Sequence, residues 1–269
     1  MLKAYLDRGA KNYGRSSVMC VGAALFKPTP YKQFTRSWER MLREWDASSF
    51  HATDFYNGGG EFQRSRPDGS AIPGRQRQFE HDSRFIPMVI GEHVHRLFVV
   101  SLKVDEYEDV APMAWRNRFG GVHQVAIQAV IDAIGHWADK ARFSGEIAYV
   151  YETGDEEESQ VSSALGKRHK SPKHRKHCRM ASKPIGVEKG KARGLEVSDF
   201  IAWHWNKFYA DTLADRSRHP RKDFSALMQT MRLNRKKIET YLMTGDALEK
   251  FLISHGCHRT SGRVSDVSS

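Results

Sequence analysis

One stretch of the sequence, SVMCVGAALF at residues 17–26, is almost entirely apolar. It is too short to cross a membrane, and Pro28 and Pro30 end it. An apolar run of this length, without alternation of polar and apolar residues, predicts a strand that is buried on both faces. Such a strand needs a packed layer on each side of its sheet, so this segment limits the fold to a sheet that is covered on both faces.

Three further strands are predicted around this segment. Residues 2–6 alternate in character, 95–104 are rich in β-branched and aromatic residues, and 146–152 carry apolar side chains on both faces. We expect the first two strands to form a hairpin and the later strands to be joined through helices. The strand at 146–152 is expected to lie centrally in the sheet.

Helices are predicted where apolar residues recur with helical spacing. The clearest are at 31–46, 121–141 and 195–209, and two more are expected at about 223–243 and 245–254. Strands that alternate with helices in this order predict an α/β domain with a mixed central sheet flanked by helices.

The chain divides into a main domain and two shorter C-terminal segments. We expect one domain over 1–210, with loop insertions at about 50–75 and 165–193, where glycine, proline and charged residues gather. Residues 211–256 are expected to form a helical extension, and 257–269 a disordered tail.

The composition combines an ordinary apolar content with a large positive charge. Forty-three Lys and Arg residues against thirty-two Asp and Glu residues give a formal net charge of +11. An excess of this size favours a polyanionic partner through counterion release, without naming one. No apolar run is long enough to span a bilayer and the first residues lack a signal-peptide core, so we expect a cytoplasmic protein without a membrane partner.

Basic residues are concentrated in KRHKSPKHRKHCR at 167–179. Such a segment can bind the phosphate backbone of a nucleic acid, and it can equally be a solvated loop. Its histidines and Cys178 match the spacing of no common zinc finger, and Cys20 and Cys257 lie far away in sequence, so we do not expect a zinc site. The candidate phosphate contacts are Lys167, Arg168, Lys170, Lys173, Arg175, Lys176 and Arg179.

Acidic residues stand at the ends of three predicted elements. Asp7 follows the first strand, Glu152 ends the strand at 146–152, and Asp199 lies near the start of the helix at 195–209. Sites in α/β sheets favour strand ends, so these residues could be neighbours. Clustered carboxylates repel one another unless a divalent cation neutralises them, and oxygen ligands suit Mg²⁺ or Mn²⁺. The alternative for Asp199 is a helix cap or a surface acid.

Several of these stretches resemble motifs of a known family. YLDRGA followed by SVMCVGAALF, then YVYETGD, and finally GLEVSDFIAW are similar, in order and spacing, to the bacterial and phage family named domain of unknown function 3800. FHATDF resembles the histidine-containing stretch that follows the first helix of that family. The resemblance covers about residues 2–209 and implies an RNase H-like fold for the domain over 1–210.

The resemblance also implies a set of functional residues. Matched position by position, it gives Asp7, Glu152 and Asp199 as the acidic set of the family. The layout is similar to that of resolvase-type RNase H-like nucleases, whose final helix can supply two acids three residues apart. Glu196, one helical turn before Asp199, would then be a fourth metal ligand.

Some positions differ from the pattern of the family. Arg8 stands where the family usually has Glu, Glu196 replaces Gln, and Ser198 replaces Ala. Arg8 could contact a phosphate, or it could weaken cation binding by placing a positive charge beside Asp7. Glu196 adds a negative charge that partly offsets Arg8.

The leading hypothesis is a divalent-metal-dependent nuclease that hydrolyses phosphodiester bonds of DNA or RNA. The four acids named above would bind Mg²⁺ or Mn²⁺, and Arg8 with the basic segment would bind the nucleic acid. His51 and Asp54 would be accessory residues that assist a water or contact substrate, and the alternative for both is a role in a local turn.

Two other functions are compatible with the sequence. One is a nucleic-acid-binding protein that keeps the RNase H-like fold without the chemistry, which the Arg8 substitution favours. The other is a component of a phage-defence or mobile-element system that acts together with protein partners, which is the setting that the resemblance implies.

Overall fold

The computed structural model describes residues 1–9, 18–66, 69–75, 79, 83–111, 113, 116–117, 120–154, 158–188, 190–214, 217, 219–254, 257–260 and 263–266. Its centre is a six-stranded mixed sheet with the strand order β5-β4-β1-β2-β3-β6. β2 is antiparallel to β1 and to β3, whereas β4 is parallel to β1, β5 to β4, and β6 to β3. The strands are β1 (Leu2–Arg8), β2 (Val18–Phe26), β3 (Arg96–Lys103), β4 (Ile147–Thr153), β5 (Ile185–Glu188) and β6 (Ile238–Met243).

β2 is the strand that the apolar run at 17–26 predicts, and all nine of its residues are buried. Successive side chains belong alternately to two apolar cores, with Met19 and Val21 in one and Cys20 and Ala24 in the other. β2 lies between β1 and β3, so both of its edges pair with neighbouring strands. Its two faces are covered as well. The expectation of a strand that is buried on both faces is confirmed.

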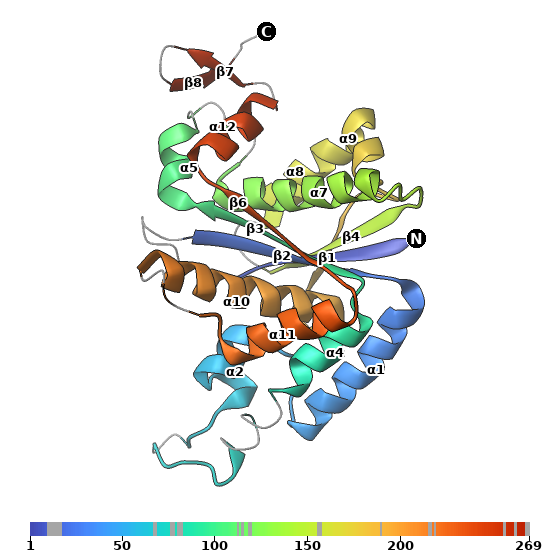
Figure 1. Ribbon diagram of the computed structural model, residues 1–269, viewed down its shortest axis with the longest axis vertical. Coiled ribbons are helices and arrows are strands. Elements are labelled where there is room, and N and C mark those ends of the chain that lie inside the picture. The colour runs from blue at the N-terminus through green and yellow to red at the C-terminus, as the bar shows by residue number, and fades with distance from the viewer. Residues whose placement is uncertain are drawn as a thin grey trace.

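Helices cover both faces of the sheet (Figure 1). The α7 face, as we call it, carries α5 (Val104–Val110), α7 (Val122–Lys140), α8 (Glu158–Lys170), α9 (Pro172–His177) and α12 (Gly245–Ser254). The opposite α10 face carries α1 (Pro28–Glu44), α2 (Ala52–Asn57), the short helix η1 (Gly60–Phe62), α4 (Phe85–His93), α10 (Arg193–Ala214) and α11 (Lys222–Leu233). This arrangement confirms the predicted α/β class with a mixed sheet flanked by helices.

α10 lies directly against β1 and β2. Gly22 of β2 has no side chain, and a Cβ there would lie 2.5 Å from the carbonyl oxygen of Ser198. At Gly9, which follows β1, a Cβ would lie 2.5 Å from the carbonyl oxygen of Ala202. The Ser198 hydroxyl donates a hydrogen bond to the carbonyl oxygen of Tyr5 at 2.7 Å. The two glycines therefore allow the backbone of α10 to approach closely enough to bond to β1.

The prediction of a helix at about 223–243 is wrong for the second half of that range. α11 ends at Leu233, and the chain from Ile238 onward forms β6, which pairs in parallel with β3. Ile238, Thr240 and Tyr241 favour extended backbone, and pairing with β3 provides the hydrogen bonds that a helix would make within itself. The segment expected to be a helical extension thus provides an edge strand of the central sheet.

The two segments expected to be loop insertions contain regular structure. The segment at 50–75 includes α2 and η1, and the segment at 165–193 includes the end of α8, all of α9, and β5. Pro172 does not break this second segment, because it occupies the first turn of α9, where proline fits a helix without loss of a hydrogen bond.

The C-terminal residues also differ from expectation. Within the tail expected to be disordered, β7 (Cys257–Thr260) and β8 (Arg263–Asp266) pair as antiparallel strands. Among the helices that the structure describes, none has the length and apolar character required to cross a membrane.

Candidate active site

Asp7 and Glu152 lie side by side at the carboxyl ends of two parallel strands. β1 and β4 pair with Leu6 opposite Tyr151, and the next residues of the two strands are Asp7 and Glu152. Asp7 projects toward the α10 face, because Tyr5, two residues earlier, packs in the core on that face. A hydrogen bond joins the carboxyl groups of Asp7 and Glu152.

Asp199 of α10 completes this group, and its negative charge acts on the carboxyl of Asp7. Its Oδ2 accepts a hydrogen bond from the backbone N–H of Ala52 at 2.7 Å and lies 3.8 Å from Nε2 of His51. The side chains of Asp7 and Asp199 are buried. We call Asp7, Glu152 and Asp199 the acidic cluster. The structure thus brings together three predicted ligands from β1, β4 and α10.

The pKa of the Asp7 carboxyl is raised well above its ordinary value. Burial is the largest cause, followed by the negative charges of Glu152 and Asp199. The hydrogen bond with Glu152 raises this pKa further, whereas the backbone N–H of Arg8, 2.7 Å from Asp7 Oδ1, lowers it. A proton held in this way compensates the repulsion between carboxylates, and a divalent cation could replace it. The oxygen donors of the cluster fit Mg²⁺ or Mn²⁺.

His51 connects the acidic cluster to a further carboxylate. Its Nδ1 lies 3.0 Å from Oδ2 of Asp54, and its Nε2 is directed toward Asp199. His51 immediately precedes α2 and Asp54 lies in the first turn of that helix, so one short element holds both residues. When Nδ1–H donates to Asp54, Nε2 remains as the ring nitrogen nearest the cluster. His51 and Asp54 therefore contact each other locally, and His51 also lies beside Asp199 of the acidic cluster.

The side chain of Glu196 contacts different residues from that of Asp199, although the two acids lie on the same helix. Its Oε2 accepts a hydrogen bond from the indole N–H of Trp38, and its Oε1 accepts one from Arg193 at 2.7 Å. Burial raises the Glu196 pKa to about 7, against the lowering effect of Arg193, Trp38 and the backbone N–H of Phe50. The interactions of Glu196 therefore join α10 to α1, and the structure does not bring this predicted fourth ligand to the acidic cluster.

Arg8 follows Asp7 in the chain, with its side chain on the other face of the sheet. It pairs with Val21 of β2, whose side chain packs in the core on the α7 face. Alternation along β1 directs Arg8 and Asp7 to opposite faces. The positive charge of Arg8 is thus directed away from the acidic cluster.

The basic segment at 167–179 is largely helical and lies on the α7 face, across the sheet from the acidic cluster (Figure 1). Two of its predicted phosphate contacts form ion pairs within the protein, Arg168 with Asp132 and Arg179 with Asp139 at 2.8 Å. Arg168 is almost completely buried. The other predicted contacts of the segment are exposed: Lys167, Lys170, Lys173, Arg175 and Lys176.

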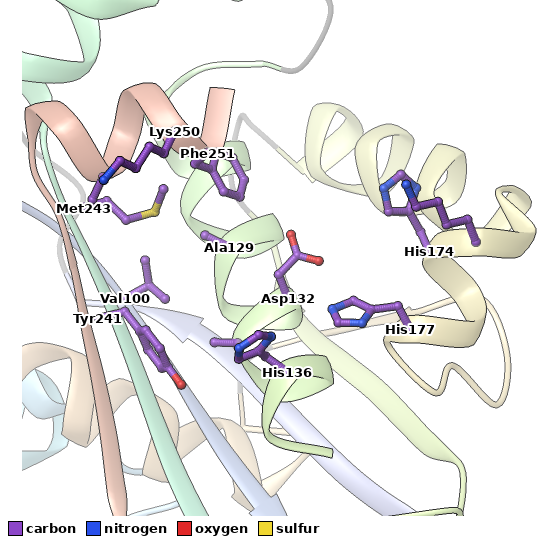
Figure 2. A pocket seen from close by; sticks show the side chains of 13 residues that line it. Val100, Ala129, Asp132, His136, His174, His177, Tyr241, Met243, Lys250 and Phe251 are labelled. Carbon is purple, nitrogen blue, oxygen red and sulfur yellow. The ribbon is translucent and has the colours of Figure 1, made fainter. Parts of the chain in front are cut away.

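A second group of ligand-type atoms lies on the α7 face. One such atom each from Asp132, His177 and Cys178 lie within 4.8 Å of one another, and Figure 2 shows Asp132 and His177 facing each other. No motif in the sequence indicates this group, because Asp132 belongs to a largely apolar helix that lies far from Cys178 in the chain. Arg168 contacts Asp132, and its Nη2 lies 3.7 Å from Sγ of Cys178. Because this guanidinium already balances the carboxylate charge, we interpret the group as a partly buried ion pair.

Comparison of the sequence with protein-family models and with curated proteins found no match. The function is therefore inferred from the geometry of the acidic cluster, from the charge of the chain, and from the order of the elements that carry the acids.

Proposed function

We propose that this protein is a divalent-metal-dependent nuclease with an RNase H-like fold, which hydrolyses phosphodiester bonds of DNA or RNA. The observation that carries the proposal is the convergence of Asp7, Glu152 and Asp199, from three separate elements, in one cluster. These residues would hold Mg²⁺ or Mn²⁺. When bound, such a cation lowers the pKa of a water molecule and neutralises charge on the leaving oxygen of a phosphodiester.

The order of the elements supports the RNase H-like fold. The resemblance implies a first strand that ends in an acid, a second apolar strand, a later strand that ends in an acid, and a helix that carries a further acid. β1, β2, β4 and α10 occur in this order along the chain. β1 and β4 are neighbours in the sheet although α1, β3 and α7 separate them in sequence, which is what brings their terminal acids together.

The residues around the acidic cluster would hold its carboxylates in position and control the release of the proton from Asp7. The proton that the raised pKa holds on Asp7 would be released when positive charge enters the cluster. The backbone N–H of Ala52 fixes Oδ2 of Asp199, and His51, held by Asp54, lies beside the same oxygen as a positioning residue. Burial of the carboxylates strengthens their electrostatic interactions, because little water screens them.

The positive charge of the chain supports a polyanionic substrate. The exposed basic residues of α8 and α9 remain predicted phosphate contacts, on the face of the sheet opposite the acidic cluster. A nucleic acid that is held there and cleaved at the cluster would have to pass around an edge of the sheet. This geometry favours a flexible single strand or a strand end over a stiff duplex that lies along one face.

The proposal is tested by cleavage assays on labelled single- and double-stranded DNA and RNA, with Mg²⁺, Mn²⁺ or EDTA. We expect cleavage with a cation and none with EDTA. Asp7→Asn and Glu152→Gln keep the shape of each side chain and remove its charge. Each should reduce cleavage by at least about 100-fold, because even residues that only support metal ligands commonly contribute roughly 10- to 100-fold.

Asp211→Asn is the matched control, because Asp211 is an exposed acid on the same helix as Asp199. This variant should cleave like the wild type. Unchanged cleavage by Asp7→Asn would overturn the assignment of the site. Nucleic-acid binding by the wild type without cation binding and without cleavage would instead select the non-catalytic binding protein.

A further inference from the structure

The α7 face carries a hollow of about 920 Å³ between α7, α9, β6 and α12. Figure 2 shows Tyr241 and Met243 on the side of β6, and His136 and His177 on the side of α7 and α9. Volumes of roughly 300–1,000 Å³ are typical of sites for small molecules. The hollow is separate from the acidic cluster, which lies on the other face of the sheet.

The polar part of the lining is positive. Lys173 and Lys250 are exposed basic residues at the hollow. Asp132 is the one acid among the lining residues that the structure describes, and Arg168 pairs with it, so this acid adds little net negative charge. The ring nitrogens that complete the polar lining belong to His136, His174 and His177.

The other part of the lining is apolar and partly aromatic. Tyr241, Met243 and Phe251 line the side formed by β6 and α12 (Figure 2). Val100 and Ala129 belong to the same apolar surface. Aromatic rings and a thioether make favourable contacts with a flat aromatic ring. The lining therefore combines a surface for a ring with basic groups, of which Lys173 and His174 lie on α9.

We propose that this hollow binds a nucleoside phosphate, which is either a free nucleotide or the phosphorylated end of a nucleic-acid strand. The base packs against Tyr241, Met243 and Phe251, and the phosphate contacts Lys173 and His174. This site does not depend on the nuclease activity proposed above, since it shares no residue with the acidic cluster. The Arg168 guanidinium already supplies a positive charge beside Asp132 and Cys178. A metal cation at the same place would be repelled by this charge, so the hollow favours an anion.

The test is calorimetric titration of the full chain with adenosine 5′-monophosphate, adenosine and inorganic phosphate. We expect the monophosphate to bind more tightly than either fragment. Lys173→Ala combined with His174→Ala should weaken monophosphate binding by about tenfold or more, because charge-assisted hydrogen bonds are lost, and leave adenosine binding unchanged. Tyr241→Leu should weaken the monophosphate and adenosine, and leave inorganic phosphate unchanged.

Lys140→Ala is the matched control, because Lys140 is an exposed lysine of α7 that does not line the hollow. It should bind the monophosphate like the wild type, and so should Asp7→Asn, which separates this site from the acidic cluster. Equal affinity of the wild type and the Lys173→Ala/His174→Ala variant for the monophosphate would overturn the proposal, as would absence of binding. A 5′-phosphorylated dinucleotide that binds more tightly than the monophosphate identifies a strand end as the ligand; weaker binding identifies a free nucleotide.

Discussion

Asp7 and Glu152 share a hydrogen bond at the ends of two parallel strands, although both are acids that water would ionise at neutral pH. The strand register creates the contact, because it aligns the residues that follow Leu6 and Tyr151. Burial and the charge of Asp199 oppose ionisation of Asp7. The proton on Asp7, and a cation that replaces it, should therefore affect the stability of the fold.

Without divalent cations, the free energy of unfolding should fall as the pH rises above 3.8 and through the raised pKa of Asp7. The folded state holds this proton more tightly than the unfolded chain. The stabilisation is therefore complete below the ordinary carboxyl pKa and is lost as the pH passes the raised one. Each unit of raised pKa corresponds to about 1.4 kcal/mol. Urea unfolding in EDTA should show a weaker pH dependence for Asp7→Asn, and an unchanged dependence would contradict the inference.

Mn²⁺ should raise the melting temperature of the wild type and have little effect on Asp7→Asn or Glu152→Gln. A cation that binds only the folded state stabilises it by about 2.7 kcal/mol at a concentration 100 times its dissociation constant. Differential scanning calorimetry with and without Mn²⁺ measures this effect. Asp211→Asn, an exposed acid on α10, should respond like the wild type. An equal response in all four proteins would show that the cation binds elsewhere.

Glu196 should stabilise the attachment of α10 and contribute little to cation binding. Trp38→Phe removes the indole N–H that Glu196 accepts and leaves a buried carboxylate oxygen without that donor. We expect the free energy of unfolding to fall by about 1–3 kcal/mol, which urea titration measures. Glu196→Gln should keep its Mn²⁺ affinity by calorimetry. A large loss of affinity in that variant would restore Glu196 as a fourth ligand.

Much of the fold could be predicted from the sequence, because long apolar patterns belong to single elements. The run at 17–26 and the periodic segments at 31–46 and 121–141 identify a central strand and two helices without knowledge of their partners. β6 could not be identified in this way. It is short and lies at the edge of the sheet, and its pairing with β3 is a contact between distant parts of the chain.

The candidate site shows the same division. Positions at element ends indicated Asp7, Glu152 and Asp199, because the ends of neighbouring parallel strands lie together. The direction of Glu196 depends on Trp38, which comes from a helix much earlier in the chain. The pairing of Asp132 with Arg168 is likewise a contact between two helices, and the basic segment that contains Arg168 does not indicate it.

Gly22→Ala should weaken both the fold and cation binding. The new Cβ would lie 2.5 Å from the carbonyl oxygen of Ser198, so α10 would have to move away from β2 and carry Asp199 with it. Overpacking of a core commonly destabilises by about 1–3 kcal/mol. Gly245→Ala is a suitable control, since a Cβ there would meet no atom within 4 Å in the part of the chain that the structure describes. Unchanged Mn²⁺ affinity in folded Gly22→Ala would contradict the positioning of Asp199 by this contact.

The ion pair between buried Arg168 and partly exposed Asp132 should matter more for stability than any exposed residue of the basic segment. Arg168→Met leaves Asp132 without its guanidinium partner. Removing one partner of a buried pair destabilises by about 3–5 kcal/mol, and we expect the lower end because Asp132 is partly exposed. Arg175→Met changes an exposed residue of the same segment and should stay within about 0.5 kcal/mol of the wild type.

A second substitution separates the ion pair from a simple loss of packing. Arg168→Met combined with Asp132→Leu removes both charges, so the double variant should recover part of the stability lost in the single one. Urea unfolding of the wild type, Arg168→Met, Asp132→Leu and the double variant gives the coupling between the two residues. Equal losses in Arg168→Met and in the double variant would show that Arg168 stabilises α8 through its packing alone. In the expected case, the charge on Asp132 is what requires a basic residue at this buried position.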